Sequence, residues 1–179
     1  GLKLQSVSYF AGPVNEERVV FTQTCGNDGT TIRSAQISIY EAEKSASTAS
    51  VDDALIRTES FRKGAKDSKV TSGLKLQSVS FFAGLVNEEK VDYTQTYGND
   101  GTTIRSTQIS VYEGEKGADT ATVDDALIRT ESFRKGAKDS KVTSGLKKQS
   151  VSYFKGLVNE EKVDFTQTYG NDAKGDRKS

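Results

Sequence analysis

Hydrophobic and polar residues alternate along Arg18–Cys25, a segment rich in β-branched and aromatic side chains. Val19, Phe21 and Cys25 share one face, and the polar threonines share the other, which is typical of a half-buried strand. A Gly-Asn-Asp-Gly sequence follows at residues 26–29 and suits a tight turn. Residues 31–41 alternate again, so the pattern predicts a β-hairpin.

A different spacing marks residues 51–63 and their copy at 123–135. Five side chains recur there at helical intervals: Val51, Ala54, Leu55, Thr58 and Phe61. Ser50 and Asp53 match a capping box at the start, and Gly64 matches a C-terminal stop. This pattern predicts a helix over 51–63 and another over 123–135. A further strand is predicted over 74–82, with counterparts at 2–10 and 146–154.

The chain repeats itself with a period of 72 residues. Residues 74–145 repeat residues 2–73 with 12 differences in 72 positions, and a third copy starts at Leu146 and stops at Asp172. Two of the differences are informative. The exchange of Val20 for Asp92 indicates an exposed position, and the exchange of Cys25 for Tyr97 indicates a roomy position at a rim.

These elements predict an α+β fold built from tandem β-β-α-β modules. The first module covers 18–84 and the second 90–156. Residues 1–17 form a leading strand equivalent to the last strand of a module, and 157–179 form a trailing strand and a polar tail. The strands left over at the two ends are expected to pair with the modules or with a partner chain.

Composition excludes several classes of function. Lys plus Arg equals Asp plus Glu at 25 each, so nothing favours nucleic acid through net charge. The absence of His removes the usual neutral-pH base, and a single Cys allows no internal disulfide or Cys-based zinc site. No apolar run is long enough to predict membrane insertion. We therefore expect a protein that is not an enzyme and holds no metal.

The acidic and glycine-rich motifs fit structural roles. The Asn-Glu-Glu sequences at 15–17, 87–89 and 159–161 are expected to be solvated turns, and Asp52-Asp53 is explained by capping. The Gly-Asn-Asp-Gly-Thr loops lack the ligand spacing of a calcium loop and the Lys-Ser/Thr of a phosphate loop. A chain opening on Gly1 without Met suggests a processed or excised product.

Aromatic side chains and Cys25 are the candidate binding residues. Adjacent aromatics on a strand face opposite sides, so one can pack inward while the other contacts a partner or both can be core. Cys25 is either a structural spectator, a link to another chain or an attachment point for a prosthetic group. The candidate partner-binding residues are Tyr9, Phe81, Tyr153, Tyr97 and Tyr169.

Residues 31–34 (Thr-Ile-Arg-Ser), 37–40 (Ile-Ser-Ile-Tyr) and 60–66 (Ser-Phe-Arg-Lys-Gly-Ala-Lys) resemble the small β-β-α-β domain of phycobilisome rod linkers. The repeated layout is similar to the gamma-type linkers of red-algal phycoerythrin. The resemblance implies a plastid protein that organises phycobiliprotein rings for light harvesting. It also implies a linear tetrapyrrole (bilin) at Cys25, although the neutral charge and single Cys depart from that family.

Three functions stay open at this point. The first is an assembly linker whose repeats bind a repeated or symmetric protein partner. The second is a secreted adhesive or self-assembling protein that forms filaments or a matrix through its end strands. The third is an extracellular carbohydrate-binding repeat that uses its Tyr side chains and Asn-Asp loops.

Overall fold

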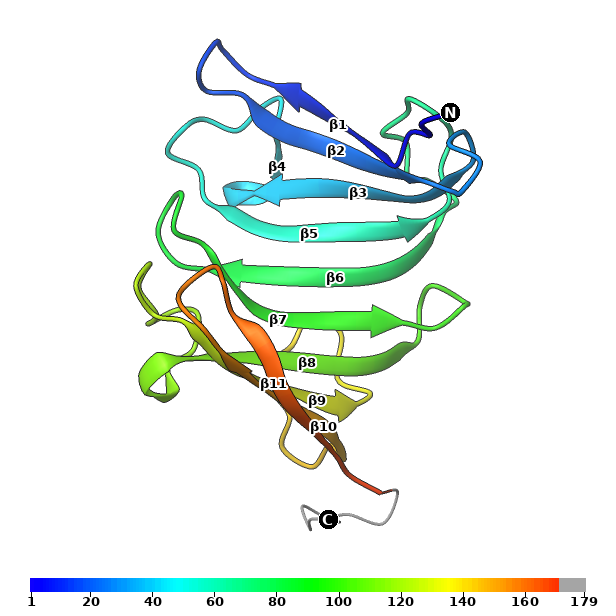
Figure 1. The fold of residues 1–179 in the computed structure, drawn as a ribbon. Helices are drawn as coiled ribbons and strands as arrows, with labels where there is room; N and C mark the ends of the chain where they lie inside the picture. Colours follow the sequence, from blue (N-terminus) through cyan, green and yellow to red (C-terminus); the bar gives the residue numbers. More distant parts are fainter. Residues whose placement is uncertain (171–179) are drawn as a thin grey trace. The chain divides into compact units, whose positions relative to one another are not determined.

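The computed structural model describes residues 1–170, whose regular secondary structure is almost entirely antiparallel β-strand (Figure 1). The strands hydrogen-bond in chain order, except that the short β4 pairs only with β3. Two 3-10 turns, η1 (Glu41–Glu43) and η2 (Glu113–Glu115), follow β3 and β8. The strands are β1 (Ser6–Ala11), β2 (Arg18–Cys25), β3 (Ile32–Tyr40), β4 (Lys44–Ser45), β5 (Leu55–Arg62), β6 (Lys75–Ala83), β7 (Lys90–Tyr97), β8 (Ile104–Tyr112), β9 (Leu127–Arg134), β10 (Lys148–Lys155) and β11 (Lys162–Thr168).

The predicted hairpin is confirmed, with β2 and β3 joined by the Gly26–Gly29 turn. Asp28 fixes this turn because its carboxylate accepts hydrogen bonds from the backbone N–H groups of Thr30 and Thr31, each at 2.9 Å, and from the Thr31 hydroxyl. These bonds, the one from the Thr31 hydroxyl first, lower the pKa of Asp28. The strands predicted at 2–10, 74–82 and 146–154 are also present, as β1, β6 and β10, and the trailing strand predicted within 157–179 is present as β11.

The predicted helices are wrong, because 51–63 and 123–135 contain the strands β5 and β9 instead. Strand β5 pairs along its whole length with β3, with Phe61 opposite Ala35 and Glu59 opposite Ile37. The segment Leu55–Arg62 does not alternate apolar and polar residues, but its β-branched Ile56 and Thr58 favour a strand once a neighbouring strand is present. The α+β class and the β-β-α-β modules are therefore corrected to an all-β fold.

The residues that resembled a helix cap form a turn. Asp53 accepts hydrogen bonds from the backbone N–H and the hydroxyl of Ser50, at 2.6 and 2.8 Å. In the second copy, Asp125 does the same with Thr122, at 2.6 and 2.9 Å. A short hydroxyl side chain and an acid three residues later make these bonds in turns as well as at helix starts, so this local signal does not require a helix.

The chain divides into two compact units. Unit 1 comprises residues 1–79 and 97–103, and unit 2 comprises 80–96 and the described residues from 104 onward. Each unit contains the four-strand pattern of the repeat, and the two are described separately below.

In each unit a buried glutamine anchors a loop to the sheet. The loop follows β5 in unit 1 and β9 in unit 2, and the glutamine lies on β2 or β7. In unit 1 the Gln23 side chain donates to the carbonyls of Ala65 and Ser68, at 2.7 and 3.2 Å, and accepts from the Asp67 backbone N–H at 2.9 Å. Unit 2 repeats the arrangement around Gln95. The loop thus covers one face of the sheet, where the buried core lies.

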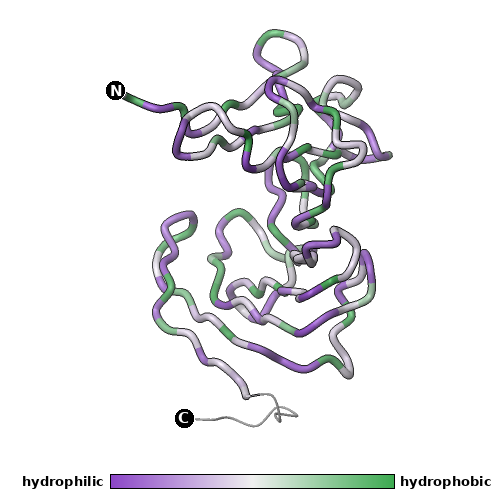
Figure 2. Tube along the Cα trace, turned by 90° about the vertical axis from the view of Figure 1, so that its right-hand side faces the viewer, coloured by the Kyte–Doolittle hydropathy of each residue, from purple (hydrophilic) through white to green (hydrophobic). Residues whose placement is uncertain are grey.

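The other face of the sheet is polar and mostly uncharged. In unit 1 the hydroxyls of Ser8 and Thr22 lie 2.9 Å apart across β1 and β2, and Thr22 is opposite Gln36 on β3. In unit 2 the Ser152 and Thr166 hydroxyls form the same pair at 2.9 Å. Polar and apolar segments consequently alternate along the strands, as Figure 2 shows.

In each unit an ion pair between a lysine and an aspartate stabilises a second loop, which follows η1 or η2. Lys116 Nζ lies 2.8 Å from both oxygens of Asp125. This hydrogen bond, followed by that from the Thr122 backbone, lowers the pKa of Asp125 from 3.8 to about 2. Lys44 and then the Ser50 backbone lower the pKa of Asp53 likewise to about 2.

This pair predicts a loss of stability in acid. Because the pKa of Asp125 is lower in the folded state, the stabilisation is complete above pH 3.8 and disappears as the pH falls through about 2. Urea unfolding at pH 5, 3 and 2 is expected to show a falling midpoint for the unsubstituted chain. Asp125→Asn should lower the midpoint at pH 5 and flatten this pH dependence, whereas Asp124→Asn, a charge change on the adjacent exposed residue, should do neither.

Candidate binding surfaces

Among residues 1–170, strand β11 forms an open edge of the sheet in unit 2, because only β10 pairs with it. Its sequence Lys-Val-Asp-Phe-Thr-Gln-Thr matches that of β7 except that Phe165 replaces Tyr93, and β7 lies between β6 and β8. Tyr93 on β7 is 7% exposed, whereas Phe165 at the same position of β11 is 47% exposed. The same positions are therefore buried in β7, between two strands, and exposed in β11, beside which residues 1–170 place only β10.

The backbone of β11 presents hydrogen-bonding groups outward. The Tyr169 N–H donates to the Gln149 carbonyl at 2.8 Å, so this residue faces β10. The backbone groups of successive strand residues point in alternate directions. The N–H of Gln167 therefore also points toward β10, while the N–H groups of Thr166 and Thr168 point away from it. An unpaired edge of this kind is a template for another strand.

Strand β1 forms the corresponding open edge in unit 1. Phe10 is 61% exposed there, whereas its counterpart Phe82 on β6 is half-buried. Among residues 1–170, every large hydrophobic side chain that is both exposed and located on a strand belongs to one of these two edges: Phe10, Val163 and Phe165.

The aromatic residues predicted to bind a partner mostly stack on one another across strands. Tyr9 stacks on Phe21 with ring centroids 4.1 Å apart, and Tyr153 stacks on Phe165 at 4.5 Å. Phe81 makes the equivalent stack in the second copy. The Tyr9 hydroxyl also donates to Asp67, which raises the pKa of Tyr9. The rings of Tyr9, Phe81 and Tyr153 are half-buried, so they stabilise strand pairing and expose only part of their surface.

The remaining two tyrosines lie at the ends of the second strand of the repeat. Tyr97 is 1% exposed, so its side chain is not presented to a partner. Tyr169 is half-buried directly after β11. Cys25, at the position of Tyr97 in the first copy, is a free thiol and is 8% exposed. The prediction of a rim position is therefore wrong, because both Cys25 and Tyr97 face the core.

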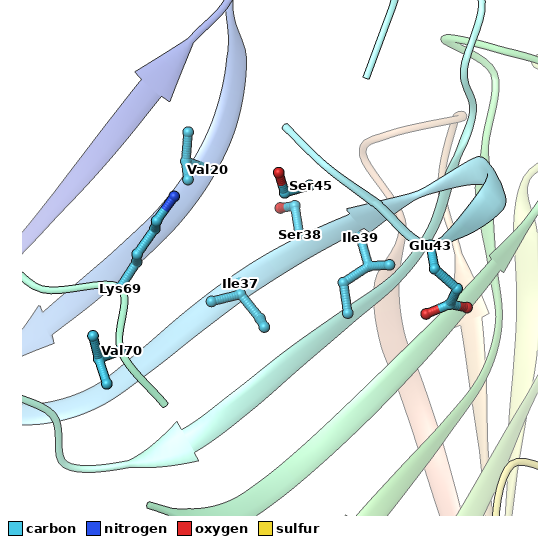
Figure 3. A pocket seen from close by; sticks show the side chains of 8 residues that line it. All are labelled: Val20, Ile37, Ser38, Ile39, Glu43, Ser45, Lys69 and Val70. Carbon is cyan, nitrogen blue, oxygen red and sulfur yellow. The ribbon is translucent and has the colours of Figure 1, made fainter. Parts of the chain in front are cut away.

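A hollow of about 320 Å³ opens on the loop-covered face of unit 1, as Figure 3 shows. Ile37 and Ile39 form its floor on β3, and Val20 and Val70 form apolar walls. The Lys69 side chain extends from the loop toward Val20 (Figure 3). Eight residues line this hollow: Val20, Ile37, Ser38, Ile39, Glu43, Ser45, Lys69 and Val70.

The second copy places an ion pair at the same position. Asp92 replaces Val20 and lies 3.0 Å from Nζ of Lys141, the counterpart of Lys69. Asp92 is 8% exposed, so the prediction that this position is exposed is wrong. A carboxylate is tolerated there because a loop lysine 49 residues away neutralises it. The exchange of Val20 for Asp92 drew attention to this position in the sequence, but the sequence did not identify Lys141 as the partner of Asp92.

Val20 lies beside the hollow because the pairing of β1 with β2 is irregular at this residue. Tyr9 is opposite Phe21 while the next residue, Phe10, is opposite Val19, so Val20 is an extra residue in β2. The same irregularity occurs at Asp164 in β11, and Asp164 pairs with Lys155 at 2.8 Å. Such a bulge redirects a side chain relative to simple alternation.

The other sequence motifs form no site. Glu16 and Glu17 are exposed beside a turn closed by the hydrogen bond from the Glu16 N–H to the Pro13 carbonyl at 3.0 Å. Within the described part of the chain, no three His, Cys, Asp or Glu side chains gather as a metal site would require. No helix in residues 1–170 has the length and apolar character needed to cross a membrane.

Comparison with protein families, with curated proteins and with solved structures finds nothing that matches this chain. The resemblance to phycobilisome linkers, a bilin on Cys25 and a plastid location therefore stay predictions. The predicted helix that contributed to that resemblance is a strand. Visible-light absorption by the native protein is the measurement that tests the pigment directly.

Proposed function

We propose that this chain is a non-enzymatic assembly protein that binds protein partners by adding their strands to its open sheet edges. The proposal rests on one comparison. Phe165 on β11 is exposed, whereas Tyr93, at the same position of the repeat on β7, is buried. Strand addition supplies affinity through backbone hydrogen bonds and specificity through alternate side chains. The partner strand expected at β11 resembles β8, which has this place beside β7.

The polar face favours the edges as the contact surface. Rows of Ser, Thr and Gln such as Ser8, Thr22 and Gln36 keep their hydroxyl and amide groups hydrated, so stacking of two such faces would bury little apolar area. The exposed strand hydrophobics instead lie on β1 and β11. A neutral net charge adds little repulsion between chains that meet at these edges.

The test uses a synthetic peptide with the sequence of residues 102–113, which includes β8. We expect it to bind the full chain, as measured by fluorescence anisotropy of a labelled peptide. Thr166→Pro removes the outward N–H and places a ring at the edge, and is expected to weaken binding about tenfold or more. Thr168→Pro, at the next outward position, should act in the same direction.

Thr166→Ala is the matched control, because it removes the hydroxyl and keeps the N–H. It should bind the peptide as the unsubstituted chain does. Urea unfolding of all three variants verifies that the edge is still formed. Peptide binding that is equally strong in the proline variants, or no peptide binding to the unsubstituted chain, would refute strand addition at β11.

A further inference from the structure

We propose that the hollow in unit 1 binds a monocarboxylate with an aliphatic chain of medium length. The chain would lie on the floor and walls formed by Ile37, Ile39 and Val20, and the carboxylate would pair with Lys69. This site is separate from the strand edges, and the proposal does not depend on strand addition.

The walls of the hollow suit an aliphatic chain. Four of the eight lining residues are Val or Ile, and the volume of about 320 Å³ falls at the small end of the range for ligand sites. Their side chains converge from β2, β3 and the loop after β5 (Figure 3). An apolar ligand of modest size would remove this surface from water, which is favourable.

Lys69 supplies the one lysine charge among the lining residues. The only acid in the lining, Glu43, is bound by Arg57 through both of its oxygens at 2.5 Å. Glu43 is therefore already neutralised, and Lys69 can pair with an incoming anion. A single cation in a lining that also contains a carboxylate suits a monoanion better than a phosphate dianion.

Comparison of the two copies singles out the hollow. Three of its eight lining positions differ between copies, namely Val20, Ile39 and Ser45, whereas nine of the other 64 positions differ. In the second copy the Asp92 carboxylate lies against Lys141 at 3.0 Å. The protein thus contains its own example of a carboxylate bound by this loop lysine, and the first copy leaves that place to a ligand.

The test uses decanoate below its micelle-forming concentration, with titration calorimetry for stoichiometry and NMR of the isoleucine methyl groups for location. One decanoate per chain is expected, with shifts at Ile37 and Ile39. Val20→Asp copies the residue of the second repeat and should weaken binding at least tenfold, since the new carboxylate occupies Lys69. Folding is not at risk, because Asp occupies this position at Asp92.

The reverse substitution gives a second, independent readout. Asp92→Val should free Lys141 and raise the stoichiometry from one to two. Lys69→Gln should weaken decanoate binding but leave binding of decanol, which has no charge, within twofold. Unchanged affinity in Val20→Asp, or methyl shifts confined to residues away from the hollow, would overturn the assignment.

Discussion

Replacement of Gly136 by alanine is expected to destabilise unit 2 by about 3–5 kcal/mol, the sum of backbone strain and overpacking. Gly136 has φ of +143°, a conformation that residues with a side chain rarely adopt. An added Cβ would lie 2.2 Å from Oγ1 of Thr107. Thr107 cannot move away easily, because it is fully buried and its hydroxyl donates to the Lys135 carbonyl at 2.9 Å.

The first copy supplies a matched control at Gly64. Its φ is +152°, but the nearest atom to an added Cβ is the Cβ of Ala35 at 3.3 Å. Gly64→Ala should therefore show the backbone strain without the severe clash, and cost about 1–3 kcal/mol. Urea unfolding of the two variants measures the difference. Equal losses would mean that the contact with Thr107 does not limit this position.

Replacement of Gln95 by methionine is expected to cost about 2–3 kcal/mol, because it removes the hydrogen bonds of a buried side chain to the loop while nearly keeping the side-chain volume. Gln95 is fully buried, and its amide nitrogen lies 2.7 Å from the Ala137 carbonyl. The Asp139 N–H donates to its amide oxygen at 3.0 Å. Loss of this anchor should also increase hydrogen exchange across residues 135–146.

Gln167 provides the control for that substitution. It occupies the same place in the third copy, where the described residues, up to 170, include no counterpart of the 135–146 loop. Gln167→Met should therefore change the free energy of unfolding by less than about 0.5 kcal/mol. If both substitutions cost the same, the stability of the strand itself, and not the loop anchor, would explain the loss at Gln95.

Several features were predictable because they depend on neighbouring residues in the chain. The turn at Gly26–Gly29 is closed by Asp28 within four residues, so its sequence signal is sufficient. The alternation in Arg18–Cys25 identifies a strand for the same reason. The 72-residue period also predicted which segments are structurally equivalent, and β1, β6 and β10 follow it.

The helix prediction failed because the spacing of apolar residues in a short segment does not by itself decide between a helix and a strand. The apolar residues around Leu55–Arg62 recur at helical spacing, but strand β3 provides a pairing partner along the whole segment. The Ser50–Asp53 bonds are local and occur in both contexts. Only the tertiary neighbour decides between the two, since a strand satisfies its backbone through another segment whereas a helix satisfies its own.

Composition and repetition by themselves determined that this protein is a tandem array with a period of 72 residues and a low share of hydrophobic residues. The tertiary structure decided which positions are buried and which are open. Asp92 is buried beside Lys141, 49 residues along the chain, and Phe165 is exposed although its sequence context matches that of Tyr93. The physical reason is that burial and ion pairing depend on which segment lies alongside, and a repeated sequence has different neighbours at its edge and in its interior.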